Sequence, residues 1–129
     1  MSGLIQPNDM KFVSKSWGYE VHIVNNEKYC GKKLFVRQGK WLSYHHHEIK
    51  DEVLFVESGR IYMTYGTNEQ DFRSIEMGPG QAFHVEPNLK HQIQAVEDTM
   101  IFEFSTQHFD TDSHRTTTDL IVSHEPDSR

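Results

Sequence analysis

The sequence predicts an all-β domain, built as a β-sandwich or barrel. Between residues 15 and 105, about ten short apolar or alternating segments follow one another, each bounded by turn residues. The same range lacks the sustained 3.6-residue periodicity of amphipathic helices. The chain has 129 residues, of which 36% are hydrophobic, and this suits one domain with a single core.

Each expected strand is a run whose side chains alternate between two faces. Strands are expected at residues 19–24, 33–38, 52–56, 60–65, 72–77, 81–85, 91–95 and 99–105, with a histidine-containing strand before residue 52. The runs on either side of Ser58-Gly59 predict a β-hairpin. We divide the chain into an N-terminal arm and first strand (1–14), a β domain (15–115) and a polar C-terminal tail (116–129).

The stretch from Gly39 to Gly59 carries the strongest chemical signal. His45 and His47 are two residues apart, so on a strand both side chains point to the same face. Glu52 follows after a short bend, at the start of the next apolar strand. Two imidazoles and a carboxylate can therefore converge on one point, and these are ligands that divalent transition metals accept.

The same stretch resembles the first motif of the cupin family. Gly39 is followed by five residues and His45, one residue and His47, four residues and Glu52, then six residues and Gly59. The resemblance implies a cupin jelly roll, and it extends over about residues 15–115.

The second cupin motif fits more loosely and runs from Gly80 to His91. Glu86 stands where the family usually has proline, and Asn88 where it usually has glycine. Asparagine tolerates the left-handed backbone better than other non-glycine residues, so the turn can form. The resemblance implies one divalent metal, whether zinc, manganese, iron or nickel, with His91 as a fourth ligand beside the two histidines and Glu52.

Three further segments resemble sugar-phosphate cupins such as type II phosphomannose isomerases: Trp17-Gly18, the basic position Lys33, and residues 110–115. This resemblance implies a sugar-phosphate isomerase or epimerase, similar to a mannose-6-phosphate isomerase, acting through a metal-stabilised enediolate. Lys33 and Arg115 would then bind the phosphate of the substrate. Either one is otherwise an ordinary surface cation.

Two residues are candidates for proton transfer. Glu103 alternates with large apolar neighbours on the last strand, which is an unusual pattern for a surface carboxylate, although a half-exposed strand would also explain it. Tyr44 is the second candidate because it lies next to His45. Two other functions stay open: a metal-dependent dioxygenase, which predicts an apolar pocket, and a non-catalytic saccharide-binding module.

Composition restricts the partners. The net charge is −6, from 13 basic and 19 acidic side chains, which argues against nucleic acid or an anionic membrane as a partner. The sequence has no apolar run near the ~20 residues of a membrane-spanning helix. A single cysteine, Cys30, fits a reducing cytoplasm. We expect a homodimer that covers open sheet edges, acting on a small-molecule substrate.

Overall fold

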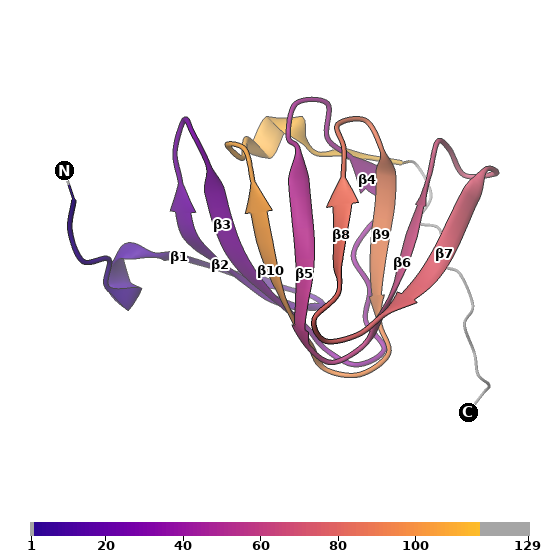
Figure 1. Ribbon diagram of the computed structural model, residues 1–129, viewed down its shortest axis with the longest axis horizontal. Coiled ribbons are helices and arrows are strands. Elements are labelled where there is room, and N and C mark those ends of the chain that lie inside the picture. Colours follow the sequence, from indigo (N-terminus) through magenta and orange to yellow (C-terminus); the bar gives the residue numbers. More distant parts are fainter. Residues whose placement is uncertain (1, 117–129) are drawn as a thin grey trace.

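The computed structural model describes residues 2–116 and folds them into two antiparallel β-sheets (Figure 1). The six-stranded sheet has the order β1 (Lys11–Lys15), β2 (Gly18–Asn25), β3 (Cys30–Val36), β10 (Thr99–Ser105), β5 (Glu52–Ser58) and β8 (Ala82–Val85). The five-stranded sheet has the order β11 (His114–Arg115), β4 (His45–His46), β9 (Lys90–Ala95), β6 (Ile61–Gly66) and β7 (Phe72–Met77).

The all-β prediction is confirmed, but the predicted hairpin at Ser58-Gly59 is wrong. β5 pairs with β10 and β8, whereas β6 pairs with β7 and β9, so the chain changes sheet at this turn. Gly59 has a φ of 94°, and an added Cβ would collide with Thr99. The turn therefore needs glycine, but it passes the chain from one sheet to the other instead of closing a hairpin.

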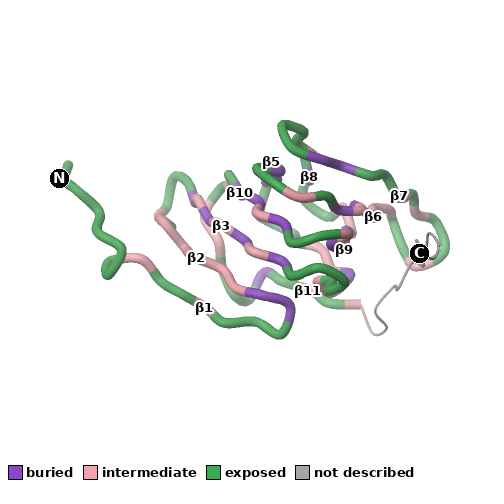
Figure 2. The backbone as a smooth tube through the Cα atoms, turned by 90° about the horizontal axis from the view of Figure 1, so that it is seen from below, coloured by how far each residue is buried: buried purple, intermediate pink, exposed green. Residues whose placement is uncertain are grey.

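The interior is divided along the strands into an apolar half and a polar half. On β3, Leu34 and Val36 enter the apolar core between the sheets, while Lys32 takes the next inward position. Figure 2 shows buried residues alternating with less buried ones along this strand. β10 repeats this arrangement with Ile101 in the core and Glu103 beyond it. Because neighbouring strands are in register, their inward polar residues gather at one end of the sandwich.

The N-terminal residues extend beyond β1, away from the body of the domain (Figure 1). They include a single 3-10 turn, η1 (Pro7–Asp9), and a second such turn, η2 (Asp110–Asp112), precedes β11. Neither turn could cross a bilayer, and residues 2–116 contain no helix long and apolar enough to do so. The expected polar tail lies outside the described residues, apart from Thr116.

Candidate functional site

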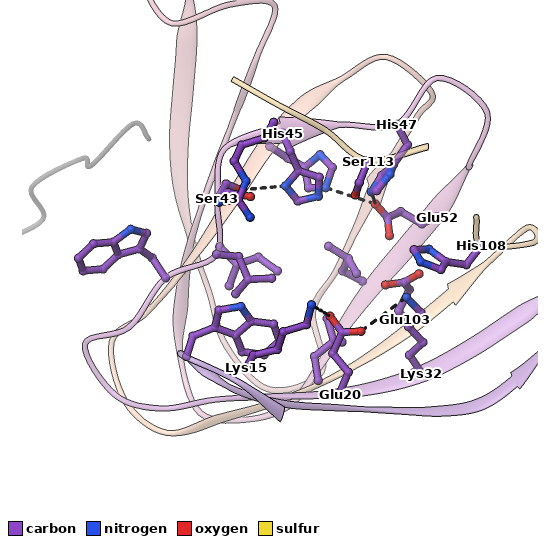
Figure 3. A pocket seen from close by; sticks show the side chains of 18 of the residues that line it. Lys15, Glu20, Lys32, Ser43, His45, His47, Glu52, Glu103, His108 and Ser113 are labelled. Atoms are coloured by element: carbon purple, nitrogen blue, oxygen red, sulfur yellow. Dashed lines mark hydrogen bonds and ion pairs between the residues drawn. The ribbon is translucent and has the colours of Figure 1, made fainter. Parts of the chain in front are cut away.

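A cavity of about 570 Å³ occupies the polar half of the sandwich. Figure 3 shows the side chains around it, with His45, His47 and Glu52 on one side and Lys15, Glu20 and Lys32 on the opposite side. His45, His47 and His91 come from β4, the segment after it, and β9; charged residues come from β1, β2, β3, β5 and β10 and from segments between strands. The cavity therefore joins residues from both sheets.

Three histidines form a cluster at this cavity. His45, His47 and His91 each offer one ring nitrogen, and these nitrogens lie within 4.8 Å of one another. His45 pairs directly with His91 across β4 and β9, and strand alternation places His47 on the same side as His45. The spacing predicted from the first motif thus brings the two histidines together with a third from a distant strand.

Backbone carbonyls fix the orientation of all three rings. The Nδ1 atom of His45 lies 2.8 Å from the Ser43 oxygen. The corresponding distances are 3.0 Å from His47 to Asp112 and 3.0 Å from His91 to Leu89. A carbonyl can only accept, so each Nδ1 carries the proton and each Nε2 presents a lone pair. This is the tautomer that a metal ligand needs.

Glu52, the first residue of β5, faces the same lone pairs. Its Oε2 atom lies 3.5 Å from Nε2 of His47 and 3.3 Å from Nε2 of His91, and it has no hydrogen-bond donor among residues 2–116. A buried carboxylate oxygen against two acceptor nitrogens is unfavourable unless a cation lies between them. The donor set of three imidazoles and one carboxylate therefore fits a divalent transition metal.

Burial keeps the imidazoles neutral. It lowers the pKa of His45 to about 3, with a further contribution from His91. Burial and the charge of Lys50 lower the pKa of His47 to about 4. Metal binding requires unprotonated imidazole, so the site stays ready for a metal in weakly acidic solution.

These shifts make the stability of the metal-free protein depend on pH. Unfolded histidines bind protons below their ordinary pKa of 6.5, whereas folded His45 and His47 do not until about pH 3 and 4. The unfolded state then holds more protons, so the free energy of unfolding should fall as pH drops from about 6.5 to about 4. Urea unfolding of chelator-treated protein over this range measures the slope. In an H45Q/H47Q variant, the free energy of unfolding should depend less steeply on pH than in wild type. The same dependence in variant and wild type would contradict the lowered pKa values of His45 and His47.

Asp112, in the short turn before β11, holds residues 47–50 in place. The buried Asp112 carboxylate accepts hydrogen bonds from the backbone N–H groups of Glu48 (2.9 Å), Ile49 (3.2 Å) and Lys50 (3.0 Å). Its backbone oxygen accepts the Nδ1–H of His47. One residue thus fixes both a histidine and the turn that leads to Glu52.

We expect Asp112→Ala to weaken metal binding about 10- to 100-fold, the usual cost of losing a group that orients a ligand. Without the carboxylate, three N–H groups lose their acceptor and the His47 ring is less constrained. Calorimetric titration with zinc measures the effect. Asp110→Ala is the matched control, since the exposed Asp110 carboxylate bonds only His108 in the described chain. Equal affinities for the two variants would contradict the role of Asp112.

The opposite wall carries a buried ion pair. Nζ of Lys50 lies 2.8 Å from Oε2 of Glu103 and 3.6 Å from Oε1 of Glu52, so it connects the histidine side to the opposite wall. Burial and the Glu52 carboxylate raise the pKa of Glu103, and the Lys50 ammonium opposes that shift. His108 completes this group, with Nδ1 3.3 Å from Lys50 and Nε2 2.9 Å from Asp110.

A second charged group lies beside this pair, centred on Glu20 from β2. Its carboxylate lies 3.8 Å from Lys32 and 4.0 Å from Lys15 (Figure 3). It also contacts His22 at 2.8 Å. Burial opposes its ionisation, but the His22 hydrogen bond and the two lysines outweigh burial and lower the pKa of Glu20 to about 2. The wall therefore offers alternating donors and acceptors, which suit a polyhydroxylated ligand.

The predicted substrate and catalytic residues fall into two groups. Glu103 and Arg115 line the cavity, and Glu103 is buried. Lys33 does not line it: its side chain lies on the outer face of β3, since the inward positions are Lys32 and Leu34. Tyr44 is also absent from the lining, because it is fully buried on the other side of the strand and donates its hydroxyl hydrogen to Asn68.

Sequence reasoning missed several cavity residues, among them Glu20, Lys32, Lys50 and His108. Strand alternation provides a signal for one of them, because Lys32 shares its face with the core residue Leu34. Lys50 and His108 lie outside regular strands, where alternation gives no signal. Their positions depend on contacts between segments far apart in the sequence.

Comparison with known proteins identifies similar chains. A family model described as Cupin domain matches residues 35–105. The chain is 25% identical over 112 residues to a D-lyxose/D-mannose isomerase of Thermosediminibacter oceani; the alignment covers 70% of this chain and 62% of the relative. The chain thus spans less than two thirds of the length of that curated relative.

Solved structures with low sequence identity share the fold. Oxalate decarboxylase of Bacillus subtilis matches with a TM-score of 0.76 at 17% identity, over 86% of this chain and 31% of that chain. The capsular polysaccharide assembling protein CapF of Staphylococcus aureus matches with 0.72 at 15%, over 84% and 33%. KdgF of Halomonas sp. matches with 0.71 at 14%, over 84% of this chain and 98% of that chain. These identities establish a common fold.

Proposed function

Because this chain belongs to the Cupin domain family, as its motifs predicted, we propose that it is a metal-dependent isomerase or epimerase of a sugar or sugar phosphate. One observation carries this assignment: a buried carboxylate, Glu103, lines the same cavity as the three-histidine cluster and Glu52. Proton transfer next to a carbonyl needs both parts, a cation for the oxygens and a base for the carbon. The similarity to a D-lyxose/D-mannose isomerase supports the same reaction class.

Each wall has a distinct role in this reaction. A divalent metal held by His45, His47, Glu52 and His91 would supply Lewis-acid stabilisation of the negative charge that develops on the substrate oxygens. Glu103 takes a proton from the hydroxyl-bearing carbon beside the carbonyl, which leaves an enediolate, and returns the proton to the former carbonyl carbon. The hydroxyl proton passes at the same time from the hydroxyl oxygen to the former carbonyl oxygen, so the product is the isomeric sugar. A raised pKa suits this task, because the carboxyl group must both accept and release the proton.

Two cations at the cavity are available for an anionic group on the substrate. Lys40 and Arg115 line the cavity, and neither has a carboxylate within 4 Å in the described part of the chain. A guanidinium fork binds phosphate or carboxylate with two parallel hydrogen bonds. Arg115 therefore takes the phosphate-binding role that the sequence assigned jointly to Lys33 and Arg115.

Deuterium uptake from heavy water tests the reaction. The metal-loaded protein is incubated with paired aldoses, ketoses and their phosphates, and exchange beside the carbonyl is followed by NMR. We expect exchange with wild type and its loss in Glu103→Gln with metal content retained, while Glu27→Gln, an exposed control, behaves as wild type. Absence of exchange with every substrate by metal-loaded wild type would overturn the isomerase assignment.

The two alternatives give different results in the same sample. A dioxygenase would consume oxygen when iron is bound. It is expected to have an apolar pocket, whereas this cavity has charged residues in its wall, including Glu20, Lys32 and Glu103. A saccharide-binding module would bind sugars in a titration without exchanging their protons. The described cavity favours the isomerase because it places an ionisable acid opposite the histidine cluster.

A further inference from the structure

The histidine segment around β4 also presents an imidazole to the side that faces away from the cavity. His45 and His47 line the cavity, whereas His46 between them does not, as strand alternation requires. His46 pairs across the strands with His114 of β11, and the two rings stack with centroids 5.0 Å apart. His114 also does not line the cavity. Two imidazoles therefore lie side by side on the outer side of the β4–β11 pair.

The carboxylate of Glu48 faces both of these rings. Its Oε2 atom lies 3.9 Å from Nε2 of His46, and its Oε1 atom lies 3.7 Å from Nε2 of His114. Both separations are longer than the ~2.7–3.2 Å of an N–H···O hydrogen bond. Two ligand atoms bound to one tetrahedral zinc ion at about 2.1 Å lie about 3.4 Å apart. The observed spacing is thus nearer to that of ligands around an ion than to that of a hydrogen bond.

This arrangement repeats the pattern of the inner cluster. There, the carboxylate of Glu52 lies 3.5 Å and 3.3 Å from the Nε2 atoms of His47 and His91. On the outer side, Nδ1 of His46 is buried and has no hydrogen-bond partner among residues 2–116. Since its Nε2 is too far from Glu48 for a hydrogen bond, an ion bound to this ring displaces no partner within the described chain.

The charges around the two rings favour a cation. Besides Glu48, the Asp112 carboxylate lies close, with Oδ1 3.8 Å from Nε2 of His114. The ammonium of Lys90 also acts on His46 and opposes them. Two negative charges and one positive charge leave one negative charge beside the neutral imidazoles, which attracts a divalent ion.

We propose that His46, His114 and Glu48 form a second metal site, outside the cavity, for zinc or a similar divalent ion that imidazole binds. We call it the outer site. Two imidazoles and a carboxylate are ligands that zinc accepts, and water completes the four positions. The three side chains are 20%, 38% and 60% exposed. The outer site therefore binds more weakly than the buried inner cluster, and it loses its ion on dialysis.

An ion at the outer site would tie β11 to the rest of its sheet. β11 is two residues long, lies at the sheet edge and, in the described chain, pairs with β4 alone. His46 and His114 come from these two strands, so a shared ion joins them directly. Arg115, which follows His114, lines the cavity. The outer site thus holds a cavity residue in place, and its existence does not depend on the reaction proposed above.

Calorimetric zinc titration of the dialysed full chain, with the inner cluster already loaded, tests the site. At pH 7.5, above the ordinary histidine pKa of about 6.5, we expect wild type to bind one further equivalent. His114→Ala and Glu48→Gln should each lose this equivalent and keep the inner ion, because neither residue lines the cavity. Circular dichroism confirms that the variants fold. His84→Ala is the matched control, since His84 also faces a carboxylate, Asp51, but on the other sheet, and it should bind zinc as wild type does.

Hydrogen exchange of residues 110–116 tests the connection to β11. At free zinc about ten times the dissociation constant of the outer site, exchange through opening of the β4–β11 pair should slow about tenfold in wild type. It should not slow in His114→Ala. Failure of wild type to bind a second equivalent would overturn the proposal. A second equivalent that both variants retain, or exchange that outer-site zinc leaves unchanged, would overturn it as well.

Discussion

Replacing His91 with alanine should reduce bound metal from one equivalent to a small fraction of it. His91 supplies one of three nitrogens that lie within 4.8 Å of one another, and its Nε2 is 3.3 Å from the Glu52 carboxylate. With this ligand gone, the remaining donors no longer surround a common point. We expect the loss of affinity to exceed the 10- to 100-fold cost of removing a group that only orients a ligand. Elemental analysis after dialysis, together with zinc titration, measures both quantities.

His84→Ala is the matched control for this experiment. His84 lies on β8 and its Nε2 is 2.7 Å from Oδ1 of Asp51, on the outer face of the sheet and outside the cavity. It should keep the metal content of wild type. Wild-type metal content in both His91→Ala and His47→Ala would refute the assignment of these histidines, and loss of metal in His84→Ala would show that the effect is not local.

Replacing Lys50 with methionine should destabilise the metal-free protein by about 3–5 kcal/mol, the usual cost of removing one member of a buried ion pair. The Lys50 ammonium is the cation that contacts both Glu103 (2.8 Å) and Glu52 (3.6 Å). Without it, the buried Glu103 and Glu52 carboxylates lose the cation that both of them contact, and Lys32 is left as the cation that acts on Glu103. Urea unfolding of chelator-treated protein measures the loss.

Two variants make this result specific to the ion pair. Lys28→Met changes an exposed lysine on the β2–β3 turn and should stay within about 0.5 kcal/mol of wild type. Lys50→Met combined with Glu103→Leu should recover much of the loss, because it removes the buried charge along with its partner. A Lys50→Met protein as stable as wild type would mean that the carboxylates are protonated or hydrated.

The sequence predicted more of the histidine cluster than of the rest of the cavity lining. His45, His47 and Glu52 are close along the chain, so strand alternation and one bend suffice to bring them near one another. The family resemblance added His91. Asn88 also fits its expected role, with a φ of 74° in the left-handed region and its N–H donating to the His47 oxygen.

The assignment of faces was less predictable, because alternation says which residues share a face but not which face is inside. Lys33 and Lys32 are adjacent, and the choice between them depends on which face of β3 meets the other sheet. For β10, the apolar rule alone would turn Phe102 and Phe104 inward, whereas the structure points Glu103 inward. On β10, Glu103 can point inward because the cavity between the sheets is polar at this end, and the two phenylalanines then lie on the outer face.

The sequence by itself determined the all-β class, the family and the proximity of His45 to His47, because these depend on residues close along the chain or on motif spacing. Tertiary structure decided that the chain changes sheet at Gly59, that Lys50 joins Glu52 to Glu103, and that Asp112 supports His47 from 65 residues away. The physical reason is the same in each case. Sheet pairing brings together side chains that no periodicity relates, and the low dielectric between the sheets then turns their proximity into strong electrostatic interactions.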